Sequence, residues 1–490
     1  MQLVAPPRPV SRPWPLTVEA WAGPGPVGAA NALRGRPGLV WLDSAMPGDP
    51  FGRWSILASD PRWTLTAYGA DVLYDGPCGP RRVGPGALHA FARAVEAEPA
   101  PIEDGANGLG LPFVGGAIGY LAFELGREVE QIPATTLDDV GAPDLAMGWY
   151  DAALVWDEVE RRGWLVGRAD AVAALRARLQ QPPHPCGDVG AGALTANMTR
   201  EVYLASVKRA LHYVQAGDIY QVNFSQRFST PLHGSGLDAY LALREASPAP
   251  FAAYLDTRGA FGGVEVMSSS PERFLLLDGD TIETRPIKGT RPRGRTPAED
   301  AALGEELRAS LKDRAEHVMI VDLERNDLGR IARAGSVKVA EFATLETYRQ
   351  VHHLTSTVRA ERRPGVSLEE TLRATFPGGS ITGAPKVRAM EIIDELEPTV
   401  RGAYTGAIGY VSAHGRMDLN IAIRTITLAN GVAHLHVGGA IVHDSDPDQE
   451  YAETLHKARG MARALGVRLP DEVSPSEPAP GDVARREARE

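Results

Sequence analysis

The sequence predicts an α+β fold, in which strands and helices do not alternate regularly along the chain. Residues 38–75 alternate apolar and polar positions between turn signals, which is typical of antiparallel strands. Residues 199–216 repeat their apolar side chains at helical spacing, behind Thr199 as the expected N-cap. A doubly wound parallel sheet needs a regular strand–helix rhythm, so this mixture favours α+β over α/β.

The first part of the chain contains most of the predicted strands. Within 38–75 we expect three consecutive antiparallel strands, at 39–44, 54–61 and 63–68. Further strands are expected at 113–120 and 152–156, and helices at 84–97 and 169–180. Phe113–Tyr120 resembles Tyr404–Tyr410, which we interpret as similar strand packing rather than duplication.

A proline- and glycine-rich stretch divides the chain. Residues 181–197 read as a linker or long loop, which separates an N-terminal lobe (1–180) from a second region (198–470). From 471 to 490, proline and charge replace the periodic apolar pattern, and a disordered tail is expected.

The composition of the 490 residues is that of an ordinary globular protein, 43% hydrophobic and 23% charged. A formal net charge of −11 argues against nucleic-acid binding, and the short basic run at 288–295 is only a weak indication of it. Cys78 and Cys186 form no metal or redox motif, which fits a reducing cytoplasm. We find no signal peptide and no run near the ~18 apolar residues that would cross a membrane, so a cytoplasmic protein without membrane association is expected.

Two neighbouring segments carry the first candidates for chemistry. Ser268–Phe274 offers the carboxylate of Glu272, and Pro286–Thr290 offers the amine of Lys288. An acid and a primary amine could transfer a proton to one small molecule and bond covalently to it. From the residues alone, a solvated surface ion pair is the commoner arrangement.

Two predicted helices present carboxylates. The stretch 312–330 is helical in period and acidic, and Glu450, Glu453 and Lys457 share one face of a helix over 449–457. Carboxylates that converge from two helices can hold Mg²⁺. Each helix alone would more often be a solvated charged face.

Three further features suggest anion binding. Arg424 lies in what reads as an apolar strand, where it needs either a structural ion pair or a substrate carboxylate. Backbone N–H groups of 437–442 could cradle a carboxylate. The glycine-rich loop 376–386, which leads into a helix over 386–395, does not have phosphate-loop spacing.

Taken in this order, the motifs resemble the chorismate-utilising enzymes over roughly residues 35–470. The segments that carry the resemblance are 268–290, 313–330, 376–397, 404–425 and 438–457. The resemblance implies a two-lobed α/β-sandwich, with helices outside and the site between two facing antiparallel sheets. It also implies that 198–470 is the chorismate-binding catalytic region.

One position separates the branches of this family. Lys288 in Pro-Ile-Lys-Gly-Thr is similar to the aminodeoxychorismate synthase component I branch, whereas anthranilate synthases usually read Pro-Ile-Ala-Gly-Thr. Gln221 stands where water-using relatives carry a lysine base. The resemblance therefore implies ammonia as the nucleophile, with anthranilate synthase component I as the alternative. A non-catalytic chorismate- or tryptophan-binding regulator would need a broken site, and the residues that match the family site are all present.

The resemblance also implies a role for each site residue. Lys288 would attack C2 of chorismate, while Glu272 protonates the departing C4 hydroxyl and ammonia then enters at C4. Glu316 and Glu453 match Mg²⁺ ligands, with Glu450 nearby. The residues that match substrate contacts are Gly289, Thr290, His353, Tyr404, Arg424, Gly438, Gly439, Ala440 and Lys457. His353 could instead be a satisfied half-buried histidine, and Ala440 replaces the usual glycine.

A second set of residues matches the family's tryptophan pocket, which gives feedback inhibition in anthranilate synthases. The set comprises Ser44, Phe51, Gly52, Arg53, Trp54, Pro250, Phe251 and Ala252. Leu42-Asp-Ser44 differs from the usual feedback-site Leu-Glu-Ser, so regulation is not expected.

The sequence shows no glutaminase of its own. Neither cysteine lies in a nucleophile-elbow context, and no partner histidine motif follows. Ammonia would therefore come from solution or from a separate glutamine amidotransferase subunit.

Overall fold

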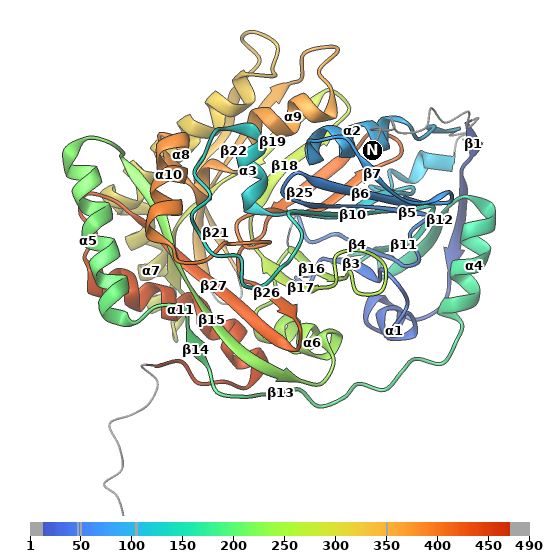
Figure 1. The fold of residues 1–490 in the computed structure, drawn as a ribbon, viewed down its shortest axis with the longest axis horizontal. Coiled ribbons are helices and arrows are strands. Elements are labelled where there is room, and N and C mark those ends of the chain that lie inside the picture. Colours follow the sequence, from blue (N-terminus) through green and yellow to red (C-terminus); the bar gives the residue numbers. More distant parts are fainter. Residues whose placement is uncertain (1–12, 47–48, 50, 103–105, 349–350, 471–490) are drawn as a thin grey trace, which may run out of the picture.

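Two large antiparallel sheets and the helices around them form the molecule (Figure 1). The structure is a computed structural model that describes residues 13–46, 49, 51–102, 106–348 and 351–470. Its main hydrophobic core joins side chains of both sheets, for example Trp41 and Leu154 of one with Leu65 and Met147 of the other. The predicted α+β class and two-sheet architecture are confirmed.

The first sheet has 12 strands. In spatial order they are β20 (Ile287–Pro292), β22 (Val351–Glu361), β19 (Thr281–Arg285), β18 (Arg273–Asp278), β25 (Met417–Ile421), β24 (Ala407–Ser412), β9 (Gly116–Leu121), β10 (Leu145–Tyr150), β5 (Trp63–Tyr68), β6 (Asp71–Gly76) and β7 (Gly79–Val83), with β21 (Lys338–Thr347) beside β22.

The second sheet has 13 strands. Their order is β13 (Gly190–Ala191), β15 (Gln221–His233), β27 (Val432–Ile441), β26 (Thr425–Ala429), β17 (Glu265–Ser270), β16 (Phe251–Asp256), β3 (Val40–Asp43), β4 (Trp54–Ala58), β11 (Ala152–Asp157), β12 (Arg162–Gly167) and β2 (Thr17–Trp21), with β14 (Thr195–Ala196) and β23 (Gly383–Ala384) beside β15. A small parallel pair joins β1 (Trp14–Pro15) to β8 (Pro101–Ile102).

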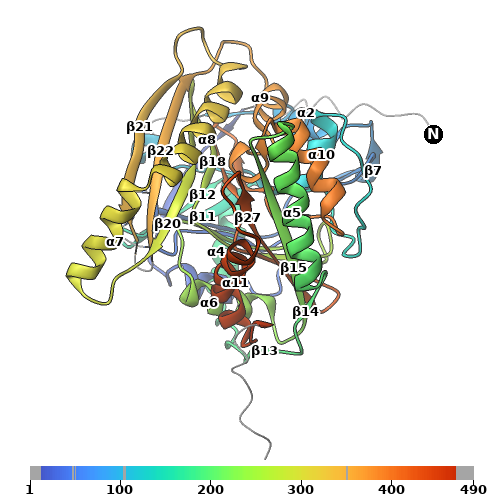
Figure 2. The ribbon, with the colours of Figure 1, turned by 90° about the vertical axis from the view of Figure 1, so that its left-hand side faces the viewer.

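The helices cover the outer faces of the two sheets (Figures 1 and 2). Those against the second sheet are α1 (Pro26–Ala32), α4 (Ala169–Leu179), α5 (Arg200–Ala216), α6 (Gly236–Ala246), α10 (Lys386–Leu396) and α11 (Pro447–Leu465). Those on the first sheet's side are α2 (Ala87–Glu96), α7 (Pro297–Ala309), α8 (Leu311–Gly329) and α9 (Leu368–Thr375), and shorter helices are α3 (Gly126–Val129), η1 (Ala106–Leu109), η2 (Phe123–Leu125) and η3 (Gly379–Ile381).

Strands from the two parts of the chain meet along two seams. In the first sheet β9 pairs with β24, so the two similar glycine-containing segments lie side by side, with Gly119 opposite Gly409. In the second sheet β3 pairs with β16. Residues before the linker thus build one end of each sheet, and residues after it build the other end. The division at 180 and 197 stays a prediction.

One strand prediction needs correction. The segments at 39–44 and 54–61 pair as β3 and β4, but the next strand, β5, lies in the other sheet. The chain crosses from one sheet to the other after Ala58. The apolar side chains of β4 and β5 then face each other across the core between the sheets, and the two strands are not hydrogen bonded to each other. Local alternation predicts a strand but not which sheet it joins.

The helix predictions agree closely with the structure. α2 and α4 lie within the predicted 84–97 and 169–180, and α5 begins after Thr199, whose side chain accepts a hydrogen bond from the N–H of Val202. Residues 181–197 form only the two-residue strands β13 and β14. The predicted tail, 471–490, lies outside the described residues.

Candidate active site

Two connections between the sheets form the centre of the site. Residues 271–272 link β17 of the second sheet to β18 of the first, and residues 422–424 link β25 to β26 in the opposite direction. The connections are hydrogen bonded to each other, since Ile421 N donates to Glu272 O at 3.0 Å and Ser269 N donates to Arg424 O at 3.1 Å. Glu272 and Arg424 are therefore neighbours although they are far apart in sequence.

Arg424 corrects the sequence analysis. It lies between two strands rather than inside one, in the left-handed region with φ of 51°, and its side chain is half-buried. Burial lowers the pKa of Arg424, and Glu272 opposes that shift. Within the described residues its guanidinium has no ion pair, which leaves it available to an anion.

Glu272 has the environment of an acid that can donate a proton near neutrality. It is 5% exposed, and its Oε1 accepts a hydrogen bond of 2.6 Å from the Ser380 hydroxyl. Burial raises the pKa of Glu272 to about 7, against the opposing effects of Ser380, Lys288 and Arg424. A general acid works best when its pKa lies near the working pH.

Lys288 lies on β20 beside a bulge that Gly289 makes possible. Burial lowers the pKa of Lys288; the attraction of Glu316 opposes this, and Lys457 lowers it further. The register with β22 shifts between Lys288 and Thr290, and Gly289 adopts φ of 80°. A Cβ there would lie 2.8 Å from Leu307 Cδ1, so no larger residue fits without movement.

His353 lies on β22 opposite Thr290. Its Nδ1 is 2.9 Å from the Thr290 hydroxyl, whereas its Nε2 is buried without a hydrogen-bond partner among the described residues. Burial, reinforced by Arg424, lowers the pKa of His353 to about 3, so the ring is neutral. The ring is thus buried and only partly satisfied, unlike the satisfied half-buried histidine that the sequence left open.

The three candidate metal ligands come from the first two turns of two helices. Ser310 caps α8 with its hydroxyl, and Asp446 caps α11 with its carboxylate, so both helices begin just before the acidic residues. Glu316 projects from α8, and Glu450 and Glu453 project from α11. Lys288 influences the pKa of both Glu316 and Glu453, which places the two helices around one centre.

The donor set fits a hard cation. A Cβ on Gly439 would lie 3.1 Å from Glu450 Oε2 and 3.8 Å from Glu453 Oε1, so these carboxylates gather over bare backbone. Oxygen-only ligands of this kind suit Mg²⁺. Glu453 is paired with Lys457 at 2.7 Å, and no three acidic, histidine or cysteine side chains of the described residues are grouped to hold an ion. Binding would have to bring Glu316 toward the pair on α11.

Backbone and donor groups meet at the end of β27. β26 pairs with β27 only as far as Leu435. Beyond that residue, the edge of β27 that faces away from β15 is not covered by β26. On β15, Ser225 lies opposite Gly438 and Asn223 lies opposite Ala440, and neither donates its N–H group to β27. Residues that face each other in an antiparallel pair either exchange both hydrogen bonds or exchange none. The N–H groups of Gly438 and Ala440 therefore point away from β15, to the open edge. Ala440 thus keeps the donor that a glycine would offer.

Tyr404 and Lys457 lie at the same edge. Lys457 Nζ donates to Gly438 O at 2.9 Å, and a Cβ on Gly438 would be 3.0 Å from the Tyr404 hydroxyl. Together with Arg424, these groups offer hydrogen bonds and positive charge to a small carboxylate.

The residues that match the tryptophan pocket also converge, at the end of β3 and the beginnings of β4 and β16. The Ser44 hydroxyl donates to Trp54 O at 2.7 Å, and the rings of Phe51 and Phe251 stack with centroids 6.4 Å apart. Arg53 is half-exposed and bonds to a carboxylate outside this group. Tryptophan binding here remains a prediction.

The comparisons with known proteins agree with this geometry. The sequence profile of the chorismate binding enzyme family matches residues 41–463. The chain belongs to this family. It is 42% identical over 438 residues to aminodeoxychorismate synthase component 1 of Escherichia coli (strain K12), covering 88% of this chain and 93% of that protein.

Two further relatives represent the alternative branch. Anthranilate synthase component 1 of Streptomyces coelicolor is 42% identical over 377 residues, covering 72% of this chain and 73% of that protein. The solved structure of anthranilate synthase component I from Streptococcus pneumoniae TIGR4 superposes with a TM-score of 0.74 at 31% identity, covering 84% of this chain and 92% of that one. The predicted family is confirmed.

Two residues of this chorismate binding enzyme were not among the predicted site residues: Ser380 and Glu324, the acid that holds the loop of Ser380. Gly379 N donates to Glu324 at 3.1 Å, and burial raises the pKa of Glu324 to about 8. The glycine-rich stretch 376–386 was the available signal, but its spacing excluded a phosphate loop and indicated no other role. It positions the hydroxyl that bonds to Glu272.

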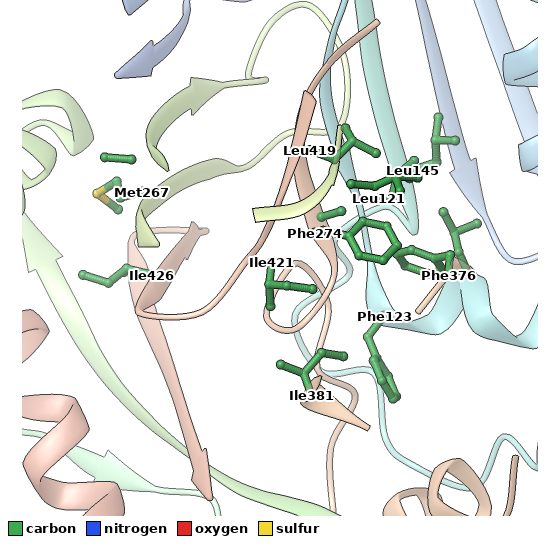
Figure 3. Packing of buried hydrophobic residues seen from close by; sticks show 14 of the residues in the cluster. Leu121, Phe123, Leu145, Met267, Phe274, Phe376, Ile381, Leu419, Ile421 and Ile426 are labelled. Carbon is green, nitrogen blue, oxygen red and sulfur yellow. The ribbon is translucent and has the colours of Figure 1, made fainter. Parts of the chain in front are cut away.

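Buried hydrophobic side chains pack beside these loops (Figure 3). Phe274, two residues after Glu272, packs edge-on against Phe376 at the start of the loop, with centroids 6.0 Å apart. Ile421 and Ile381 lie beside them. Dense packing of this kind limits the movement of the acid and of its hydroxyl donor.

Among the described residues, none of the helices combines the length and the apolar composition that crossing a membrane requires.

Proposed function

We propose that the chain converts chorismate and ammonia to 4-amino-4-deoxychorismate, as a component I of aminodeoxychorismate synthase. The observation that carries this proposal is Lys288, a half-buried amine of lowered pKa in the electrostatic field of Glu272. The 93% coverage of the Escherichia coli aminodeoxychorismate synthase component 1 supports the same branch. p-Aminobenzoate and folate synthesis would consume the product.

The proposed reaction has two displacements. The neutral amine of Lys288 forms a bond to C2 of chorismate, both ring double bonds shift by one position toward C4, and the C4 hydroxyl departs as water with the proton of Glu272. Ammonia then bonds to C4, and the lysine leaves from C2, which restores the free amine. Glu272 returns to its acid form with a proton released by the attacking amines.

Substrate binding is assigned to the donors around the β27 edge. Arg424 and Tyr404 would hold one carboxylate, together with the N–H groups of Gly438 and Ala440. His353 and Thr290 lie beside Lys288 and would position the ring. These assignments rest on proximity and on the family match, and alanine substitution of each residue tests them through the KM for chorismate.

We also propose Mg²⁺ as the cofactor, held by Glu316 and Glu453 with Glu450 nearby. The ion would neutralise a substrate carboxylate among these acids. Excess EDTA should abolish turnover, and Glu453→Gln should raise the Mg²⁺ concentration needed for half-maximal activity, because an anionic ligand is lost. Full activity of the EDTA-treated enzyme would contradict this assignment.

A separate amidotransferase is the proposed source of ammonia, in keeping with the printed name "component 1" of the relatives. The free, exposed thiols of Cys78 and Cys186 fit a reducing cytoplasm, where such a complex would work.

Product identification tests the proposed function. The purified chain, incubated with chorismate, Mg²⁺ and an ammonium salt at alkaline pH, should form aminodeoxychorismate, identified by mass and chromatography. With glutamine as the sole nitrogen source it should form none. Anthranilate and pyruvate as products would establish the alternative branch instead.

A further inference from the structure

A cavity of about 220 Å³ lies behind the substrate site and is not used by the proposed chemistry. Its inner wall includes Tyr404 and Thr425, and Thr425 directly follows Arg424. Its outer part is lined by Gly69, Asp138, Val140 and Ala142, which are exposed or half-buried. The cavity therefore leads from a different face of the protein to the back of Tyr404.

His436 presents a free proton acceptor to this cavity. The ring is 7% exposed and lies against the Tyr404 ring, tilted by 58° with centroids 5.2 Å apart. Its Nδ1 lies 3.1 Å from Arg401 O, and because a carbonyl only accepts, Nδ1 carries the proton. Among the described residues Nε2 has no hydrogen-bond partner, and His436 is one of the residues that line the cavity. Its lone pair is available to a ligand.

The charges around the cavity favour a small hydrogen-bond donor over an anion. All three arginines that line it are already paired with carboxylates: Arg127 with Asp394, Arg227 with Asp139, and Arg401 with Glu397. The lining carboxylates accept mainly backbone N–H groups and keep unused lone pairs.

Two of those carboxylates lie along the cavity wall. Asp144 accepts from Gly69 N at 2.6 Å, and Glu124 accepts from Arg401 N at 2.8 Å and from Gly402 N at 3.0 Å. Burial raises the pKa of Glu124 to about 7, and the charge of Asp144 adds to that rise. A wall of this kind attracts ammonium at its mouth and offers acceptors to neutral ammonia farther in.

We propose that this cavity admits and holds ammonia, with His436 Nε2 accepting a hydrogen bond from it behind Tyr404. Ammonia is about the size of water, which occupies ~30 Å³, so the cavity has room for several molecules. The inference rests on the proposed function, because only an ammonia-dependent reaction needs such an entry. It gives the second substrate a route that chorismate in the main site does not block.

Steady-state kinetics with an ammonium salt as nitrogen source test the proposal. His436→Leu should raise the KM for ammonia about five- to tenfold through loss of one hydrogen bond, and leave the KM for chorismate unchanged. His436→Gln, whose amide oxygen can still accept, should be closer to the wild type.

A second variant avoids the buried histidine. Ala142→Trp, at the half-buried outer part, should lower kcat/KM for ammonia by narrowing the entry, whereas Val159→Trp on an exposed turn should not. Equal rises in both KM values, or an unchanged KM for ammonia in both cavity variants, would overturn the inference and leave the proposed function in place. A wild-type chain that cannot use ammonia would overturn both.

Discussion

At the residue scale, the site depends on how burial changes the protonation of two groups. Burial lowers the pKa of Lys288 and raises the pKa of Glu272 to about 7, so both shifts favour the neutral forms. A neutral amine can attack carbon, and a neutral carboxylic acid can donate a proton. A salt bridge between the same residues at the surface would favour the opposite, charged forms.

Lys288 should therefore form a covalent adduct. With chorismate and Mg²⁺ but no ammonia, mass spectrometry should find a mass increase on the peptide that carries Lys288. Lys288→Ala should lose the adduct and most of the aminodeoxychorismate, and Lys288→Arg should do no better, because a guanidinium stays charged. Wild-type product and rate in Lys288→Ala would show that the amine is a bystander.

Glu272 should govern the alkaline limb of the pH profile. At a constant concentration of free NH₃, kcat should fall as pH rises through about 7, because the acid form of Glu272 is lost. Ser380→Ala removes a hydrogen bond that lowers the pKa of Glu272, so the limb should move to higher pH. Glu272→Gln should lose ~10²–10⁴-fold in kcat and show no such limb. If kcat still fell at the same pH in both variants, the titrating group would be one other than Glu272.

At the element scale, the bulge in β20 determines how Thr290 is oriented relative to Lys288. Lys288 pairs with Leu354 of β22, and after the bulge at Gly289 the next residue, Thr290, pairs with His353 and contacts it. Without the bulge, alternation along the strand would reverse the faces of the residues that follow.

Gly289→Ala should thus affect activity more than stability. The left-handed φ costs an alanine about 1–2 kcal/mol, and the contact with Leu307 adds displacement of the strand. Gly279→Ala is the matched control, because its φ of 59° carries the same backbone cost but a Cβ there meets no atom within 4 Å. We expect similar losses in Tm, with kcat lost only in Gly289→Ala. Equal activities of the two variants would contradict a positioning role for the bulge.

At the scale of the whole molecule, the two parts of the chain complete each other's sheets. The seam strands β9 and β3 are almost fully buried, yet each has one of its two partner strands in the second part of the chain. Separating the parts would expose two apolar strand edges at once, and such edges lead to aggregation.

Residues 1–190 expressed alone should therefore not form a stable monomer. Size-exclusion chromatography should show aggregates or higher oligomers, and coexpression with residues 191–490 should recover a complex with catalytic activity. Circular dichroism of the full chain should show one cooperative unfolding transition. A monomeric fragment that unfolds at the Tm of the full chain would contradict the dependence on the seams.

The sequence by itself was sufficient to identify the family, the α+β class and six of the helices, because these depend on short motifs and on local periodicity. Pro-Ile-Lys-Gly-Thr, or the spacing of Glu450, Glu453 and Lys457, can be read without knowing what lies nearby.

Only the tertiary structure decided which groups meet and which form each group takes. The crossing between sheets at 271–272 and 422–424 brings Arg424 to Glu272, and Ser380 reaches Glu272 across 108 positions of sequence. The lowered pKa of Lys288 and the free Nε2 of His436 likewise depend on atoms contributed by distant strands. Desolvation and long-range pairing are properties of the surroundings of a residue, which no local pattern records.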